Sequence, residues 1–89
     1  MASAVVDKTV SENFIVVFSK DSCPYCVMAK DLLRSLNQDF VAIELDQRED
    51  GKDIQNYLIK STGHKTVPNI FINQKHVGGC ADLKEMVCR

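Results

Sequence analysis

The sequence lacks long apolar runs, an excess of charge of one sign and low-complexity tracts. No run approaches the roughly 20 apolar residues that a membrane-spanning helix needs, so we expect no membrane segment. The formal net charge is -1, so bulk electrostatics give no reason to expect a nucleic acid or an anionic membrane as partner. Residues 1–10 have the pattern of neither a signal peptide nor an Arg-rich transit peptide, which predicts a cytoplasmic protein.

The chain has room for a single domain. Its 89 residues contain no internal repeat and no linker that would divide them. A chain this short buries only about 60 % of the surface that its unfolded form exposes. We therefore expect one domain over residues 1–89, with a compact core.

The cysteines are too sparse for a metal ribbon and too clustered for a disulfide scaffold. Cys23 and Cys26 form one Cys-x-x-Cys, whereas Cys80 and Cys88 are too far apart to be a second close pair. A zinc ribbon needs that second pair or histidine partners, and a disulfide scaffold spreads its cysteines through loops. One Cys-x-x-Cys beside a strand–helix pattern indicates a redox dithiol, although two ordinary buried cysteines would give the same spacing. We expect no metal site.

Apolar periodicity predicts a mixture of helices and strands. The run at 14–18 is apolar at every position, which is typical of a strand buried on both faces of a sheet. Apolar positions alternate with others over 41–45, which indicates a second strand. We expect helices around 5–10, 24–36, 54–62 and 81–87, and strands at 14–18, 41–45, 69–72 and 75–77.

The order of these elements predicts an α/β fold with a four-stranded mixed sheet flanked by helices. Strands that alternate with helices pair in parallel through right-handed crossovers, and the closing hairpin adds an antiparallel edge. The helix that starts at Pro24 has one apolar face, which we expect to pack on the sheet. That face consists of Tyr25, Met28, Ala29, Leu32, Leu33 and Leu36.

Position assigns different roles to the two cysteines of the motif. Pro24 fits the first position of a helix, which puts Cys23 at the N-cap and Cys26 about one turn inside. Lowering a thiol pKa by about two units takes roughly 2.7 kcal/mol, whereas a helix N-terminus supplies about 0.3–1 kcal/mol. The charge of Lys20, the Cys26 thiol and the free amides of the first turn can contribute the remainder. We therefore expect Cys23 to be the nucleophile and Cys26 the resolving thiol.

Three motifs together resemble those of the dithiol glutaredoxins. They are Cys-Pro-Tyr-Cys at 23–26, Thr-Val-Pro at 66–68 and Gly-Gly-Cys-Ala-Asp at 78–82. The resemblance implies a thioredoxin-like fold and a monomeric oxidoreductase. Glutathione would be its cosubstrate, and protein–glutathione mixed disulfides, small disulfides and disulfide-bonded proteins its substrates.

The resemblance also implies a glutathione site. The Val67–Pro68 bond would be cis, with the Val67 backbone pairing with the cysteine of glutathione. Lys20 and Gln55 would hold the glycine carboxylate, and the turn from Gly79 would hold the γ-glutamyl end. The full expected set is Lys20, Tyr25, Gln55, Thr66, Val67, Pro68, Gly79, Cys80 and Asp82.

Each of these residues also has an ordinary interpretation. Lys20 and Gln55 fit solvated surface positions, Tyr25 a packing position and Thr66 a loop position. Asp82 fits the first turn of a helix, where an acid complements the helix dipole. We expect both histidines, His64 and His76, to be surface residues.

Two further functions are compatible with the motif. Some relatives bind an iron–sulfur cluster between two subunits, but Pro24 disfavours this because cluster binders more often have a small residue there. A thioredoxin-type reductase would share the Cys-x-x-Cys but would have no use for the turn at 78–82.

The sequence departs from the family pattern at Ala81, where Ser or Asp is common, and at Cys88, which matches no family position. Cys80 and Cys88 are candidates for secondary oxidation.

Overall fold

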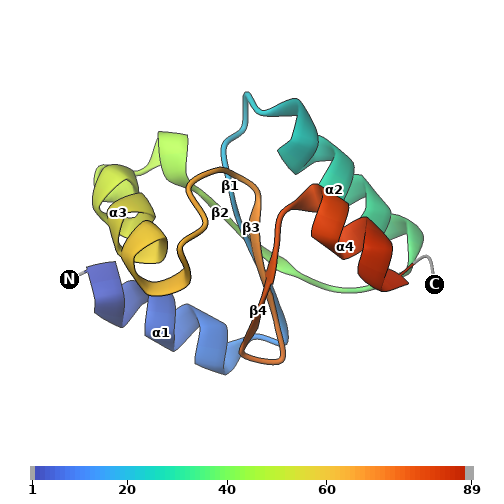
Figure 1. Cartoon of the computed structure of the whole chain (residues 1–89), viewed down its shortest axis with the longest axis horizontal. Helices are drawn as coiled ribbons and strands as arrows, with labels where there is room; N and C mark the ends of the chain where they lie inside the picture. Colours follow the sequence, from blue (N-terminus) through green and yellow to red (C-terminus); the bar gives the residue numbers. More distant parts are fainter. Residues whose placement is uncertain (1, 88–89) are drawn as a thin grey trace.

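The computed structural model describes residues 2–87 of the chain, so the predicted oxidation site at Cys88 lies outside the described residues. Helices and strands follow each other in the predicted order, with one short 3-10 helix added after the second strand (Figure 1). The helices are α1 (Ala2–Glu12), α2 (Pro24–Ser35), α3 (Gly51–Thr62), α4 (Cys80–Val87) and the 3-10 helix η1 (Leu45–Gln47). The strands are β1 (Ile15–Ser19), β2 (Val41–Glu44), β3 (Asn69–Ile72) and β4 (Lys75–Gly78).

The four strands form one mixed sheet in the order β2-β1-β3-β4, which confirms the predicted fold class. β1 pairs in parallel with β2, and Val16 lies opposite Val41. β3 pairs antiparallel with β1, and Val16 faces Phe71 there. The expectation of parallel pairing across each helix is therefore wrong for β3. The segment after α3 carries the chain back to the end of the sheet where β1 finishes, so β3 runs in the opposite direction (Figure 1).

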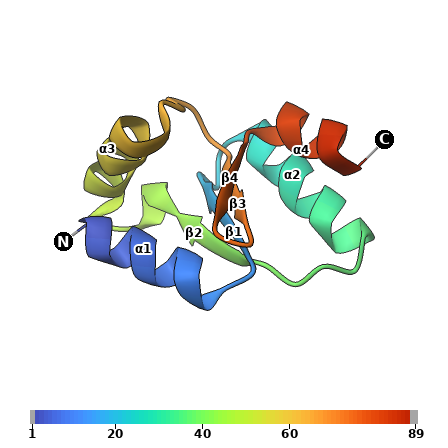
Figure 2. The same ribbon diagram turned by 60° about the horizontal axis from the view of Figure 1, so that its bottom comes forward.

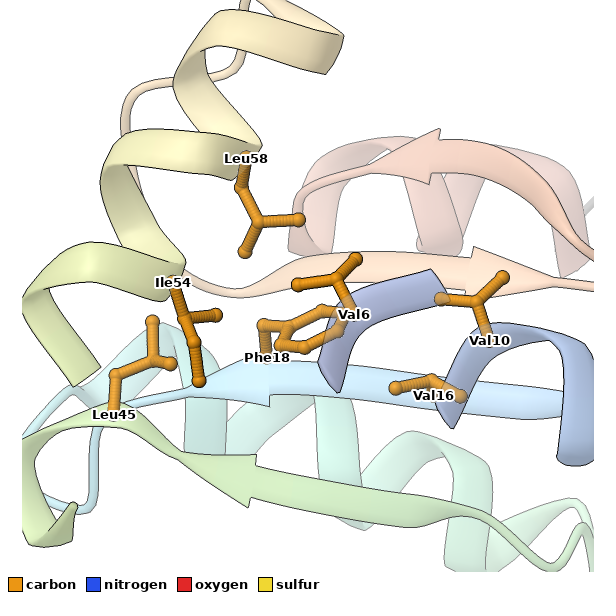
Figure 3. Packing of buried hydrophobic residues seen from close by; sticks show 7 residues of the cluster. All are labelled: Val6, Val10, Val16, Phe18, Leu45, Ile54 and Leu58. Atoms are coloured by element: carbon orange, nitrogen blue, oxygen red, sulfur yellow. The ribbon is translucent and has the colours of Figure 1, made fainter. Parts of the chain in front are cut away.

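The helices cover the sheet in two pairs, α1 with α3 on one face and α2 with α4 on the other (Figure 2). Side chains of β1 point alternately into the two layers. Val16 and Phe18 belong to the cluster under α1 and α3 (Figure 3), whereas Ile15 and Val17 belong to the cluster under α2 and α4. The prediction of a strand buried on both faces is confirmed for these residues. Phe14 precedes the strand and is 62 % exposed.

The ends of α2 and α3 follow the residues that the sequence suggested. Pro24 opens α2 directly after Cys23. Gly63 ends α3 in the left-handed conformation with φ 76°, and its amide donates to the Ile59 carbonyl. The start of α3 is earlier than predicted because Gly51 already belongs to the helix and packs against Leu45, where a side chain would overlap the Leu45 carbonyl.

The buried face of α2 differs from the predicted one. Tyr25, Met28 and Leu36 are 63 %, 42 % and 41 % exposed. The buried positions are Cys26, Ala29, Lys30 and Leu33. The apolar residues of α2 therefore belong to two different surfaces of the helix. One part packs on the sheet, and the other part is exposed to solvent. None of the helices within residues 2–87 is both long enough and apolar enough to cross a membrane.

Candidate active site

Cys23 occupies the N-cap of α2, at the end of the sheet where β1 finishes. Its backbone is extended, with φ -90° and ψ 119°, and its amide donates to the Lys20 carbonyl across 3.0 Å. The side chain is half-buried, so the sulfur is accessible. Sγ lies 3.7 Å from the carbonyl oxygen of Val67, to which the thiol donates. The Val67–Pro68 bond is cis.

Cys26 lies one turn into α2, and its side chain is fully buried. The backbone amide of Lys20 donates to its Sγ across 3.5 Å. The segment that precedes α2 therefore folds over the second thiol and leaves the first one facing outward.

The surroundings separate the pKa values of the two thiols. Partial burial works to raise the pKa of Cys23, but the Cys26 amide and thiol, the Tyr25 amide and the charge of Lys20 outweigh it and lower the pKa below the ordinary value. Burial raises the pKa of Cys26 to about 12, and the nearby Cys23 adds to this. The Lys20 amide and the charge of Lys30 only partly offset that rise. Cys23 is thus the thiol that ionises first and can act as a nucleophile.

A buried polar network lies next to this thiol pair. Lys30, on the same helix as Cys26, pairs with the carboxylate of Glu44, and their side chains are 11 % and 21 % exposed. The second oxygen of Glu44 accepts a hydrogen bond from the Ser19 hydroxyl across 2.8 Å. Lys30 sits among apolar residues in the helix pattern, and only the pairing of β2 with β1 brings Glu44 to it.

A pocket of about 520 Å³ lies between the start of α2, the loop that precedes β3 and the start of α4. It brings together most of the glutathione residues that the sequence analysis named, namely Tyr25, Thr66, Val67, Pro68, Gly79, Cys80 and Asp82. It is also lined by Met28, His64, Ala81 and Lys84. A larger hollow of about 820 Å³ between α1, α3 and the β3–β4 hairpin contains no cysteine in its lining.

Two expected site residues do not line this pocket. Lys20 is half-buried in the turn before α2, and Gln55 is half-buried in α3. Their placement at the glycine end of glutathione stays a prediction.

Asp82 acts on the backbone of its own turn. Its Oδ2 accepts a hydrogen bond from the Gly79 amide across 2.9 Å, and the Leu83 amide bonds back to the Gly79 carbonyl across 3.0 Å. This is the arrangement in which an acidic residue in the first turn of a helix satisfies a free amide at the helix start. The carboxylate is exposed and remains open to a ligand in the pocket.

His64 is a pocket residue that the sequence analysis placed on the surface. It is half-buried, and its Nε2 lies 3.2 Å from the Pro68 carbonyl oxygen. The useful signal was its position, directly after the Gly63 helix end and two residues before Thr66. His76 is exposed as predicted, and its Nε2 lies 2.9 Å from Oδ1 of the buried Asn69.

An ionisable thiol at a helix start, a buried partner thiol and a pocket beside a cis-proline loop define a thiol–disulfide oxidoreductase of thioredoxin-like fold. The family model of the glutaredoxins matches residues 15–77. The chain belongs to the glutaredoxin family, whose members are glutathione-dependent thiol–disulfide oxidoreductases.

Relatives in plants resemble the chain over most of its length. A glutaredoxin of Vernicia fordii is 52 % identical over 80 residues, which are 90 % of this chain and 77 % of the relative. Glutaredoxin-C6 of Oryza sativa is 50 % identical over 82 residues, covering 92 % of this chain and 73 % of the relative.

Solved structures agree with the fold at similar identity. A crystal structure of a buckwheat glutaredoxin–glutathione complex superimposes with a TM-score of 0.94 at 46 % identity, covering 96 % of this chain and 77 % of that one. A wheat glutaredoxin gives a TM-score of 0.96 at 47 % identity, covering 100 % of this chain and 84 % of that one.

Proposed function

We propose that this enzyme reduces protein–glutathione mixed disulfides and small disulfides with glutathione, through Cys23 as nucleophile and Cys26 as resolving thiol. The observation that carries this assignment is the asymmetry of the two thiols. Cys23 is accessible with a lowered pKa, whereas Cys26 is fully buried with its pKa raised to about 12.

The first step forms a mixed disulfide on the enzyme. The Cys23 thiolate attacks the glutathione sulfur of the substrate, and the bond between that sulfur and the protein sulfur breaks. The protein thiolate leaves and takes up a proton, while Cys23 becomes bonded to glutathione. The amides at the start of α2 stabilise the negative charge on Cys23 before the attack.

The second step regenerates the enzyme. A second glutathione, as the thiolate, attacks the glutathione sulfur held on Cys23. Oxidised glutathione leaves, and the electron pair of the broken bond returns to Cys23 as a thiolate. The net reaction consumes one glutathione thiol and releases one protein thiol, and the glutathione of the substrate leaves as half of oxidised glutathione.

Cys26 adds a second route for disulfide-bonded proteins. When Cys23 is bonded to a protein sulfur, Cys26 gives up its proton and attacks the Cys23 sulfur. The bond from Cys23 to the protein sulfur breaks, the protein thiolate leaves and takes up that proton, and an intramolecular disulfide forms on the enzyme. Two glutathione molecules then reduce that disulfide. The buried, protonated state of Cys26 makes it a poor nucleophile toward outside substrates, which leaves the first attack to Cys23.

The pocket next to Cys23 is the proposed glutathione site. The buckwheat relative was crystallised as a complex with glutathione, and the lining of this pocket includes Tyr25, Thr66, Val67, Gly79 and Asp82. An extended peptide binds well by pairing its backbone with an exposed edge, and the Val67 backbone offers such an edge. The Asp82 carboxylate can pair with the γ-glutamyl ammonium. In this proposal, Lys20 and Gln55 bind the glycine carboxylate of glutathione.

A cytoplasmic location, a monomeric state, a single domain over residues 1–89 and the protein substrates stay predictions from the sequence.

The decisive experiment is a glutathione-coupled assay on a glutathione mixed disulfide. We expect Cys23→Ser to lose turnover and Cys26→Ser to keep much of it, since the two-step route needs only the first thiol. Cys88→Ser serves as the matched control, because that cysteine has no place in either step or among the expected glutathione residues. Retained turnover in Cys23→Ser would show that the nucleophile is assigned wrongly.

A further inference from the structure

His64 is held by the end of α3 before its ring reaches the pocket. Gly63 turns the chain out of the helix with φ 76°. The His64 amide then donates to the Thr62 hydroxyl across 3.1 Å, and that hydroxyl donates to the Leu58 carbonyl across 2.7 Å. The backbone of His64 is thereby tied to the last turns of α3, at the carbonyl of the buried Leu58.

The ring of His64 contacts the loop that carries the proposed backbone edge for glutathione. Nε2 lies 3.2 Å from the Pro68 carbonyl oxygen and 3.3 Å from the Thr66 hydroxyl. A carbonyl oxygen can only accept, so a hydrogen bond to Pro68 requires the tautomer with the hydrogen on Nε2, in which the Thr66 hydroxyl cannot donate to that nitrogen. These two contacts lie on either side of Val67, whose carbonyl accepts the Cys23 thiol.

The same ring lies against the turn that begins α4. A Cβ placed on Gly79 would lie 3.4 Å from Cε1 of His64 and 3.7 Å from the Pro68 carbonyl oxygen. The imidazole therefore lies beside both the Pro68 carbonyl and Gly79. The His76 ring centroid is 5.7 Å from that of His64, and Nε2 of His76 lies within hydrogen-bond distance of Asn69, which is 2 % exposed.

We propose that His64 is a positioning residue that holds the loop at 66–68 and the turn at Gly79 at the spacing that the glutathionyl group needs. The inference rests on the proposed function, because these two walls are the proposed contacts for the cysteine and the γ-glutamyl end of glutathione. His64 sets how well the glutathionyl group binds and leaves the thiolate chemistry of Cys23 unchanged.

The test compares two replacements of similar length that differ in one group. His64→Gln keeps an N–H donor for the Pro68 carbonyl, whereas His64→Met has none. With the mixed disulfide of glutathione and 2-mercaptoethanol as substrate, we expect His64→Met to raise KM about threefold to tenfold, the effect of losing one hydrogen bond. We expect kcat to stay within about twofold, and His64→Gln to restore KM to within about twofold of the wild type.

Lys60→Ala is the matched control, because Lys60 is exposed near the same end of α3 and lies outside the pocket lining. We expect it to leave KM and kcat unchanged. An unchanged KM in His64→Met, a fall in kcat alone, or equal KM values for the Gln and Met variants would each overturn the inference.

A measurement on the unmodified protein keeps the inference testable if a variant does not fold. Long-range ¹H–¹⁵N NMR distinguishes the two neutral forms of a histidine ring, and we expect His64 to carry its hydrogen on Nε2. Hydrogen on Nδ1 would contradict the bond to Pro68 and the inference with it. If the wild type itself does not turn over with glutathione, the proposed function fails; if it does and His64→Met keeps the wild-type KM, only the role of His64 fails.

Discussion

The backbone amide of Lys20 donates a hydrogen bond to the sulfur of Cys26 across 3.5 Å. Burial is the largest influence on both thiols, and it works to raise both pKa values. Lys20 opposes it twice, through its amide at Cys26 and through its side-chain charge at Cys23. The amides at the start of α2 reach Cys23 but not Cys26, so the net shifts have opposite signs.

Alkylation of the reduced protein reports the lowered pKa of Cys23. We expect its rate with iodoacetamide to rise with pH through a midpoint below 9.0, the ordinary thiol value. Only the thiolate reacts, and Cys26 remains protonated and buried over that range. Mass spectrometry identifies the modified residue, and the urea-unfolded protein is the control in which both thiols react alike. A midpoint at or above 9.0, or first modification at Cys26, would contradict the assignment.

Stability in alkali reports the raised pKa of Cys26. The unfolded chain loses this proton near pH 9.0, whereas the folded protein keeps it until about pH 12. Between pH 9.0 and about pH 12 the unfolded state therefore binds fewer protons than the folded state. The contribution of Cys26 to the free energy of unfolding is complete below pH 9.0 and is lost as the pH rises towards 12. We expect the urea midpoint of the reduced wild type to fall more steeply above pH 9 than that of Cys26→Ser. Parallel pH profiles would show that Cys26 ionises normally.

The pair of Lys30 and Glu44 contributes to stability through its burial. Replacing Lys30 by Met leaves the Glu44 carboxylate without its counter-charge, and we expect a loss of about 1–3 kcal/mol in the free energy of unfolding. Lys30→Met/Glu44→Leu should lose less than Lys30→Met, because no unpaired charge remains. Urea denaturation measures both. The exposed pair of Asp31 and Arg34 is the control, and Asp31→Asn should change stability by less than about 0.5 kcal/mol.

Gly51 reverses the usual effect of alanine in a helix. Gly→Ala inside a helix ordinarily stabilises a protein by about 0.5–1 kcal/mol. At Gly51 the added Cβ would overlap the Leu45 backbone carbonyl, so we expect Gly51→Ala to be destabilising. Gly63→Ala is the comparison, because a Cβ there meets open space and only the positive φ of 76° opposes it, at about 1 kcal/mol. Thermal unfolding ranks the two, and a stabilised Gly51→Ala would exclude the predicted overlap.

Lys20 and Gln55 test the glycine end of the proposed glutathione site. We expect Lys20→Met and Gln55→Ala each to raise KM for a glutathione mixed disulfide about threefold to tenfold, because each removes a contact to a carboxylate. Lys52→Ala, an exposed lysine of the same helix as Gln55, is the control. An unchanged KM in both variants would mean that Lys20 and Gln55 do not bind glutathione. That result would agree with their position outside the pocket lining.

Local signals predicted the positions at which elements begin and end. Proline after Cys23 and glycine at position 63 fixed the start of α2 and the end of α3, because they act through backbone geometry alone. Strand β3 was predicted residue by residue. Its direction was not, since the direction depends on where the preceding segment re-enters the sheet.

The features that could not be predicted from the sequence depend on contacts between distant segments of the chain. Apolar periodicity could not separate Tyr25 and Met28, which border the pocket, from Ala29 and Leu33, which pack on the sheet. Lys30 is buried only because Glu44 meets it across the fold. His64 likewise looked like a surface residue, because its partners Pro68 and Gly79 come together only once β3 and α4 are in place.

The double-sided burial of β1 makes the two halves of the molecule cooperative. Val16 and Phe18 support the layer of α1 and α3, and Ile15 and Val17 support the layer of α2 and α4. Loosening either layer exposes the strand on which the other rests, so the layers have little freedom to unfold separately. The helix α2, which carries both active-site cysteines, therefore unfolds only when the whole domain unfolds. Heat or denaturant should abolish activity and structure in a single transition.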